Sequence, residues 1–155
     1  MKYSLLYQSP IGPFVITEAN GGIAALTLGA AIPADAEEKS TPLLQKAASQ
    51  LQEYFEGKRK NFDLPLTQEG TEFQQRVWQA LCRIPYGETR SYKQLAQMSD
   101  SPKGYRAVGM ANNKNHIPII VPCHRVIGAN GKLVGYALGL DIKEFLLKLE
   151  QQNAS

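Results

Sequence analysis

The sequence predicts two domains: an α/β N-terminal domain with an antiparallel sheet plus one helix over 1–66, and a mainly α domain over 71–155. Three observations support this division. Short strand-like segments separated by turn residues fill the first 30 positions, one long helical pattern follows them, and most later segments have helical spacing. A chain of 155 residues accommodates one large domain or two small ones.

The N-terminal part combines three strand candidates with one helix. The strand candidates are Lys2–Tyr7, Phe14–Thr17 and Ile23–Leu28. Asn20-Gly21-Gly22 is a strong hairpin signal, because both turn positions need residues that tolerate positive φ. Thr41 followed by Pro42 indicates a helix start, since threonine caps free amide groups and proline fits the first helical position. We expect this helix to end at Gly57.

Helical spacing dominates the second half. One helix is predicted over 73–83, where Phe73 and Trp78 share an apolar face. Ser91-x-x-Gln94 is a capping box that opens a short helix, and Pro102 is expected to start another after a break at 98–101. Two short helices joined by a tight turn are a helix-turn-helix candidate.

The segment after these helices predicts a strand, a hairpin and a last helix. Residues 117–121 form an apolar, mostly β-branched run typical of a buried strand. Residues 126–128 lead to the turn pair Asn130-Gly131, so a hairpin follows the helix-turn-helix, as in a winged helix-turn-helix domain. Asp141-x-x-Glu144 predicts a capping box for the last helix. The apolar face of that helix is expected to contain Phe145, Leu146 and Leu149.

Positive charge is concentrated in the second half. Residues 1–70 contain six Lys/Arg and eight Asp/Glu, whereas 71–155 contain eleven Lys/Arg and six Asp/Glu. Lys103, Arg106 and Lys114 lie on or beside the second helix of the helix-turn-helix candidate. Such an uneven distribution favours a polyanionic partner, most often nucleic acid. A solvated positive face is the alternative.

Composition excludes several classes of protein. The chain has two cysteines, too few for a disulfide framework, and no apolar segment long enough to span a bilayer or to serve as a secretory signal. No phosphate-binding loop, Gly-x-Ser-x-Gly elbow or dinucleotide fingerprint is present. We therefore expect a soluble, cytoplasmic protein with free thiols.

Cys123 is the most informative position for chemistry. It follows the predicted strand and Pro122, and it precedes His124 and Arg125, which are polar neighbours able to activate a thiol. A buried core cysteine is the alternative interpretation. Cys82 lies within the predicted helix and is interpreted as a packing residue.

His124 could be the base for Cys123 or a structural histidine. Neighbouring side chains on an extended chain point to opposite faces, so the pair would need a bridging water or a bend. No zinc site is expected, because the cysteines and histidines lack metal-ligand spacing, and His116 is interpreted as a surface or packing residue. From the residues alone, Glu150 is a solvated helix position.

The second half resembles the methylated-DNA–protein-cysteine methyltransferases, or O6-alkylguanine-DNA alkyltransferases. The match centres on the run from Ile119 to Gly128, which contains Pro122-Cys123-His124-Arg125, and covers about 71–150 closely. Further matching positions are Phe73, Trp78, Ile84-Pro85-x-Gly87, Ser91-Tyr92, Arg106-Ala107-Val108-Gly109, Asn115, Asn130-Gly131, Gly135-Tyr136, Gly139-Leu140 and Lys143-Glu144. The plan of 1–66 is similar to the ribonuclease-H-like N-terminal domain of this family.

The resemblance implies a repair protein that acts once and needs no cofactor. Cys123 would take the alkyl group from O6-methylguanine, or from O4-methylthymine, in a nucleotide flipped out of double-stranded DNA. His124 would activate the thiol through an ordered water, and Glu150 would hold the imidazole. Tyr92 would donate a hydrogen bond to the departing guanine, and Asn115 would fasten the segment around the site. The family also implies a protein that is monomeric in solution.

The resemblance assigns DNA contacts and a pocket as well. Arg106 would fill the gap left by the flipped nucleotide, and further DNA contacts would come from Lys103, Tyr105, Ala107, Gly109 and Arg125. The pocket wall would be formed by Val126, Gly135, Tyr136, Ala137 and Leu138. Leu138 stands where many members have glycine, which adds bulk to this loop.

Two other classes of function compete with this interpretation. A non-catalytic protein that binds alkylation damage could use the same scaffold, but such proteins replace the nucleophile, whereas Cys123 is present here. A winged-helix transcription regulator with a redox cysteine would explain the basic half, but not the coincidence of Tyr92, Arg106, Asn115 and Glu150.

Overall fold

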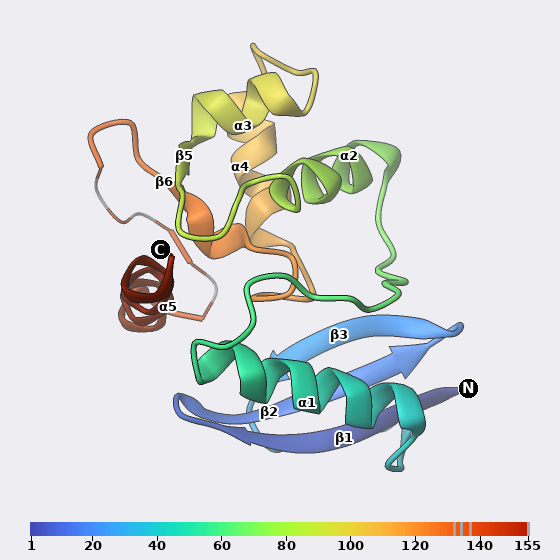
Figure 1. The fold of residues 1–155 in the computed structure, drawn as a ribbon. Coiled ribbons are helices and arrows are strands. Elements are labelled where there is room, and N and C mark those ends of the chain that lie inside the picture. Colours follow the sequence, from blue (N-terminus) through green and yellow to red (C-terminus); the bar gives the residue numbers. More distant parts are fainter. Residues whose placement is uncertain (132, 134, 137, 155) are drawn as a thin grey trace. The chain divides into compact units, whose positions relative to one another are not determined.

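A computed structural model describes the whole chain except residues 132, 134, 137 and 155. The chain folds into two compact units, Met1–Glu69 and Gly70–Ser155 (Figure 1). The first unit is a sheet with one helix, and the second is mainly helical, as the sequence predicts. Among the described residues, no helix has the length and apolar character needed to cross a membrane.

The first unit is built on a four-stranded sheet. Its strands are β1 (Lys2–Ser9), β2 (Gly12–Ala19), β3 (Gly22–Leu28) and β4 (Ala36–Glu38), in the order β3-β2-β1-β4. β1, β2 and β3 pair antiparallel, and the β2–β3 turn contains Asn20 and Gly21, both at positive φ as the hairpin signal requires. β4 pairs parallel to β1 at the sheet edge. The sequence did not predict β4, because three residues carry no alternating pattern.

One helix, α1 (Pro42–Phe55), lies across a face of this sheet (Figure 1). The Thr41 hydroxyl accepts a hydrogen bond from the Leu44 amide at 3.1 Å, so the predicted cap is confirmed. Leu44, Leu51 and Tyr54 are fully buried. This helix and the sheet form the apolar core of the first unit.

Helices α2 (Glu72–Leu81), α3 (Tyr92–Met98), α4 (Tyr105–Asn113) and α5 (Leu140–Asn153) form the second unit, together with the two-residue strands β5 (Arg90–Ser91) and β6 (Val126–Ile127) and the 3-10 turn η1 (Cys123–Arg125). The predicted Ser91–Gln94 capping box is confirmed: the Gln94 amide donates to Ser91 Oγ at 3.1 Å, and the Ser91 amide donates to Gln94 Oε1 at 2.8 Å. This cap fixes the start of α3 at Tyr92.

Two predicted helix starts are wrong. α4 begins at Tyr105 rather than Pro102, because the chain first makes a turn in which the Gly104 amide donates to the Ser101 carbonyl at 2.8 Å. α5 has Gly139 at its cap and no side-chain cap, so Asp141 lies inside the first turn instead of capping it. The apolar face of α5 also differs from the prediction, since Phe145 is exposed.

The predicted strand over 117–121 is also wrong, whereas the second arm of the hairpin predicted after it includes residues 132 and 134, which lie outside the described residues. Residues 117–121 are buried but fold as consecutive turns, in which the Ile120 amide donates to Pro118 and the Val121 amide to Ile117, both at 2.9 Å. Proline interrupts the run, and Ile119 adopts a φ of 74°, outside the extended region. β6 pairs parallel to β5, and the described residues after the Gly131 turn form no strand.

Candidate active site

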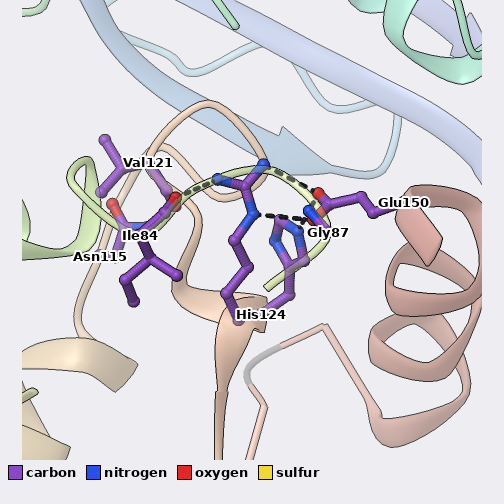
Figure 2. Close-up of polar contacts among 7 residues, drawn as sticks. Ile84, Gly87, Asn115, Val121, His124 and Glu150 are labelled. Atoms are coloured by element: carbon purple, nitrogen blue, oxygen red, sulfur yellow. Dashed lines mark hydrogen bonds and ion pairs between the residues drawn. The ribbon is translucent and has the colours of Figure 1, made fainter. Parts of the chain in front are cut away.

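Asn115 shapes the segment that carries Cys123. Its side-chain amide donates to the Val121 carbonyl at 2.8 Å (Figure 2), and its oxygen accepts from the Ile117 amide at 3.0 Å. These two hydrogen bonds hold the turns of residues 117–121 around the Asn115 side chain. They satisfy backbone groups that a strand would have paired with its neighbour in a sheet. The turns end at Pro122, and η1 begins at Cys123.

Cys123 and His124 are consecutive residues of a 3-10 turn, not of an extended strand. Successive side chains on a 3-10 helix are separated by about 120° rather than 180°. The opposite-face geometry expected from the sequence is therefore absent, and both side chains can border one site. This turn takes the place of the strand end that the sequence predicts before Cys123.

The Cys123 thiol is buried, and burial raises its pKa to about 11. Three neighbours partly oppose this rise in pKa: the polar side chain of Asn115, the positive charge of Lys143 and the hydroxyl group of Tyr136. The thiol is consequently protonated at neutral pH. A nucleophilic role requires a base that removes this proton when the substrate is in place.

His124 and Glu150 form a buried pair. His124 Nε2 lies 2.6 Å from Glu150 Oε2, and both side chains are inaccessible to solvent (Figure 2). Burial lowers the His124 pKa; burial alone would raise the Glu150 pKa, but His124 and Arg125 bring it down to about 2. The pair is thus a neutral imidazole that donates Nε2–H to a carboxylate. Nδ1 is then a bare acceptor, and it has no hydrogen-bond partner among the described residues.

Two sequence-based interpretations of this region are wrong. Glu150 is not a solvated helix residue, since it is fully buried on α5. Arg125, expected to contact DNA, is buried, and its guanidinium donates to both Glu150 oxygens at 2.8 and 3.0 Å and to the Ile84 carbonyl at 2.6 Å. Those bonds engage all three guanidinium nitrogens internally. We therefore reassign Arg125 from DNA contact to support of Glu150 and of the loop that begins at Ile84.

Tyr92 borders the thiol from the start of α3. Its ring packs against Gly109 of α4, where an added β-carbon would lie 3.6 Å from two ring atoms. Burial first, and the charge of Cys123 second, raise the Tyr92 pKa, so the hydroxyl stays protonated and able to donate. A β-carbon on Gly135 would lie 3.7 Å from this hydroxyl and 3.8 Å from Asn113 Nδ2. Tyr92, Gly135 and the end of α4 therefore meet in one place.

The remaining predicted pocket residues differ in burial and in backbone conformation. Val126 is fully buried in β6, Leu138 is half-buried, and Tyr136 is half-buried beside the Cys123 thiol. Gly135 has a φ of 54°, which glycine adopts easily. Ala137, the fifth predicted pocket residue, lies outside the described residues.

The predicted DNA-contact residues lie at the start of α4. Lys103, Tyr105, Arg106 and Ala107 are exposed, and Tyr105 retains 42% of its accessible surface. Gly109 is half-buried and faces Tyr92. Arg106 and Lys103 thus remain available to a partner, whereas Gly109 contributes to the wall beside Tyr92.

Sequence reasoning missed Lys143 and Asn112, and it misplaced Cys82. Lys143 is buried on α5, where its ammonium lies 3.5 Å from the Gly135 carbonyl and 5.9 Å from the Tyr136 ring centre. Its position about two helical turns before Glu150, on the face that contains Leu146, was an available signal. Asn112 is buried on α4 without any signal in the sequence. Cys82 is exposed just after α2, so its interpretation as a packing residue is wrong.

Comparison with known proteins places the chain in a family. Residues 1–68 match the model for the ribonuclease-like domain of 6-O-methylguanine DNA methyltransferase, and residues 72–152 match the model for its DNA-binding domain. Methylated-DNA–protein-cysteine methyltransferase from Methanosarcina barkeri is 54% identical over 99% of both chains. The constitutive enzyme of that name from Bacillus subtilis is 51% identical, over 97% of this chain and 96% of its own.

A solved structure agrees with the sequence comparisons. The structure of Mycobacterium tuberculosis OGT in complex with DNA superposes with a TM-score of 0.89 at 44% identity, covering 97% of this chain and 94% of that one. The two family models together span nearly the whole sequence, and the relatives match it end to end. The chain therefore belongs to the 6-O-methylguanine DNA methyltransferase family.

Proposed function

We propose that this chain repairs alkylated DNA by direct reversal, moving the methyl group of O6-methylguanine to Sγ of its own Cys123. Family membership gives the reaction class, methylated-DNA–protein-cysteine methyl transfer. One observation carries the assignment of residues: a buried neutral His124, with Nε2–H committed to Glu150 and Nδ1 bare, follows directly after a buried cysteine.

The chemistry follows from these protonation states. A thiol with a pKa of about 11 does not ionise alone at neutral pH, so a water between Sγ and Nδ1 passes the thiol proton to the imidazole. Carboxylate Glu150 then stabilises the imidazolium at Nε2. The sulfur lone pair forms the S–CH₃ bond as the C–O6 bond breaks, leaving the electron pair on the guanine.

Tyr92 stabilises the negative charge that this electron pair places on the guanine, and the proton held by His124 returns to the base as it departs, so guanine leaves as a neutral molecule. The Tyr92 hydroxyl is protonated and lies beside Gly135 at the edge of the site, where it can donate a hydrogen bond to the departing base. Asn115 keeps the Cys123 segment in its turns during this step. The thioether product has no ready leaving group, so each molecule acts once.

DNA is the partner, and we also propose how this chain binds the duplex. The second unit acts as a winged helix-turn-helix in which the start of α4 presents Tyr105, Arg106 and Ala107 to the duplex, with Lys103 in the turn before it, and the first unit has the ribonuclease-H-like fold. Phosphate contacts give affinity with little sequence preference, as a search for rare lesions requires. Arg106 fills the gap left by the flipped nucleotide and offsets part of the unstacking cost of a few kcal/mol.

The base itself is enclosed by a wall that includes Val126, Gly135, Tyr136 and Leu138. The proposed substrate range is O6-alkylguanine, with O4-methylthymine as a second lesion, and the proposed active species is a monomer. A non-catalytic damage-binding role is the second candidate class. The presence of both Cys123 and its His124–Glu150 pair argues against it.

The decisive experiment is intact mass with peptide mapping after stoichiometric incubation with a duplex that contains one O6-methylguanine. We expect a gain of one methyl group on the peptide containing Cys123. Cys123→Ala should gain none, and the matched control Cys82→Ala, which removes the exposed thiol, should react as the native chain does. Lesion binding without any mass change would establish the damage-binding role instead.

A further inference from the structure

Asn112 is a buried polar residue that the mechanism above does not use. Its side chain is 1% exposed on the last turn of α4, and neither its amide nitrogen nor its amide oxygen has a hydrogen-bond partner among the described residues. Burying an amide without partners destabilises a fold, because the hydrogen bonds that water supplied are lost. A carboxamide that is buried without hydrogen-bond partners indicates that its partner is a bound molecule rather than another part of the chain.

Asn112 belongs to the same helix as two residues that border the candidate active site. Gly109, three residues earlier, faces the Tyr92 ring, and residues three or four apart share one face of a helix. Asn113, four residues after Gly109, brings its amide to Gly135 beside the Tyr92 hydroxyl. Asn112 and Asn113 therefore lie one helical turn after Gly109, on either side of the line that continues its face along the helix. Asn113 is exposed, whereas Asn112 is buried.

The next residues of the chain tie Asn112 to the nucleophile. The backbone amide of Asn115 donates to the Asn112 carbonyl at 3.4 Å, and the Asn115 side chain donates to the carbonyl of Val121, two residues before Cys123. The unpartnered amide therefore lies on the helix turn that joins the Tyr92 wall to the residue that holds the segment before the thiol. A base delivered to Cys123 must come close to this turn.

We propose that the Asn112 carboxamide hydrogen-bonds the polar edge of the extruded base and is a specificity-determining residue for the alkylated purine. O6-alkylguanine presents ring-nitrogen acceptors and an exocyclic amine donor, and a carboxamide offers one donor group and one acceptor to match them. Asparagine reads the edge of adenine in duplex DNA in the same two-point manner. The inference rests on the proposed function, since it needs a flipped base in the site.

Asn112→Leu tests the proposal, because leucine keeps a similar volume without polar atoms. We expect the single-turnover rate of methyl transfer from O6-methylguanine duplex to fall at least tenfold. The thermal midpoint should stay equal or rise, since the variant removes a buried amide that lacked partners. The rate at which iodoacetamide modifies Cys123 should be unchanged, because this reagent needs no base recognition. Gln79→Leu, at an exposed amide position of α2, is the matched control and should react at the native rate.

Binding gives an independent measure in a Cys123→Ala background, where no reaction occurs. Adding Asn112→Leu should remove most of the preference for lesion duplex over undamaged duplex and leave the affinity for undamaged duplex unchanged. A transfer rate within twofold of native overturns the proposal, as does a rate loss matched by an equal loss of iodoacetamide reactivity or by a lower thermal midpoint. If Asn112→Leu does not fold, Asn112→Ala makes the same comparison.

The native chain in the same assay separates the two levels of inference. If the native protein gains no methyl group, the proposed function itself is wrong. If the native protein reacts and Asn112→Leu reacts equally fast, the proposed function stands and only the role of Asn112 is overturned.

Discussion

The two units bury different kinds of polar residue. In the first unit the buried polar side chains are neutral, and each has a hydrogen-bond or other partner: Ser4, Thr17, Thr41, Gln50 and Gln68. In the described part of the second unit, the buried set includes His124, Arg125, Lys143 and Glu150. The first unit thus buries hydroxyls and amides, whereas the second buries ionisable groups around a cysteine.

Burying charged groups costs the second unit stability, and the proposed reaction accounts for why it buries them. Removing charges from water costs several kcal/mol per ion, and an ion pair recovers that cost only with good geometry and further hydrogen bonds. Glu150 meets this condition, because it accepts hydrogen bonds from His124, from Arg125 and from the Gly87 amide. The second unit tolerates the cost because the same carboxylate fixes the tautomer of the proposed base. The first unit has no such reason to bury charge.

Glu150→Ala should show the contrast most strongly. Removing the carboxylate leaves Arg125 and His124 buried without their partner, which is expected to lower the free energy of unfolding by about 3–5 kcal/mol. Methyl transfer should also be lost, because the His124 tautomer is no longer fixed. Urea unfolding followed by single-turnover kinetics on the folded fraction measures both effects.

The matched variant in the first unit is Asp35→Ala. Asp35 pairs with Lys2 at 2.9 Å, but the pair is exposed to solvent, so we expect no measurable change in stability or rate. Equal destabilisation by the two variants would contradict the distinction drawn between buried and exposed charge.

Acid should weaken the second unit through two groups. The His124 pKa is lowered below 6.5, so the stability that its neutral form contributes is complete above pH 6.5 and is lost as the pH falls below that value. The Glu150 pKa is lowered from 4.5 to about 2, so its contribution is complete above pH 4.5 and is lost between pH 4.5 and 2. Both shifts make the second unit less stable in acid.

Trp78 allows this effect to be measured. It is the only tryptophan of the chain and is buried in α2 of the second unit, so its fluorescence reports unfolding there. The urea midpoint should fall steadily from pH 7 to pH 3, and Glu150→Gln should flatten the part of the curve below pH 4.5. Phe14→Leu, a core variant of the first unit without a titrating group, should keep the native slope. A flat native profile would count against the buried pair.

Local signals in the sequence predicted much of the fold. The Thr41 and Ser91 caps and the Asn20-Gly21 hairpin turn depend on neighbouring residues only, and the structure confirms all three. The 117–121 run was misread because its β-branched residues suggested a ladder. Pro118 and the Asn115 side chain instead fold it into turns, a solution that composition and periodicity do not reveal.

The misassigned site residues share a different cause. Charged residues on an amphipathic helix are usually solvated, so the residues alone predict an exposed Glu150, whereas the DNA contact of Arg125 comes from the family resemblance. Their burial depends on each other: the carboxylate is tolerable only because the guanidinium is there. Such mutual compensation joins residues 25 positions apart and cannot be read from either one.

Removing either of two helix caps should give a small loss of stability and sharpen the comparison of the units. Thr41→Ala and Ser91→Ala each remove a hydroxyl that accepts from a helix amide at 3.1 Å, which is worth about 1 kcal/mol of stability. Thr41→Ala should cost slightly more, because the Thr41 hydroxyl also donates to Glu18.

The similar stability losses should have different consequences for the reaction. Ser91 directly precedes Tyr92, so a frayed start of α3 displaces the Tyr92 hydroxyl from the site and should lower the methyl-transfer rate of the folded protein several-fold. Thr41→Ala should leave that rate at the native value, and an equal rate for both variants would show that the start of α3 tolerates the loss of its cap.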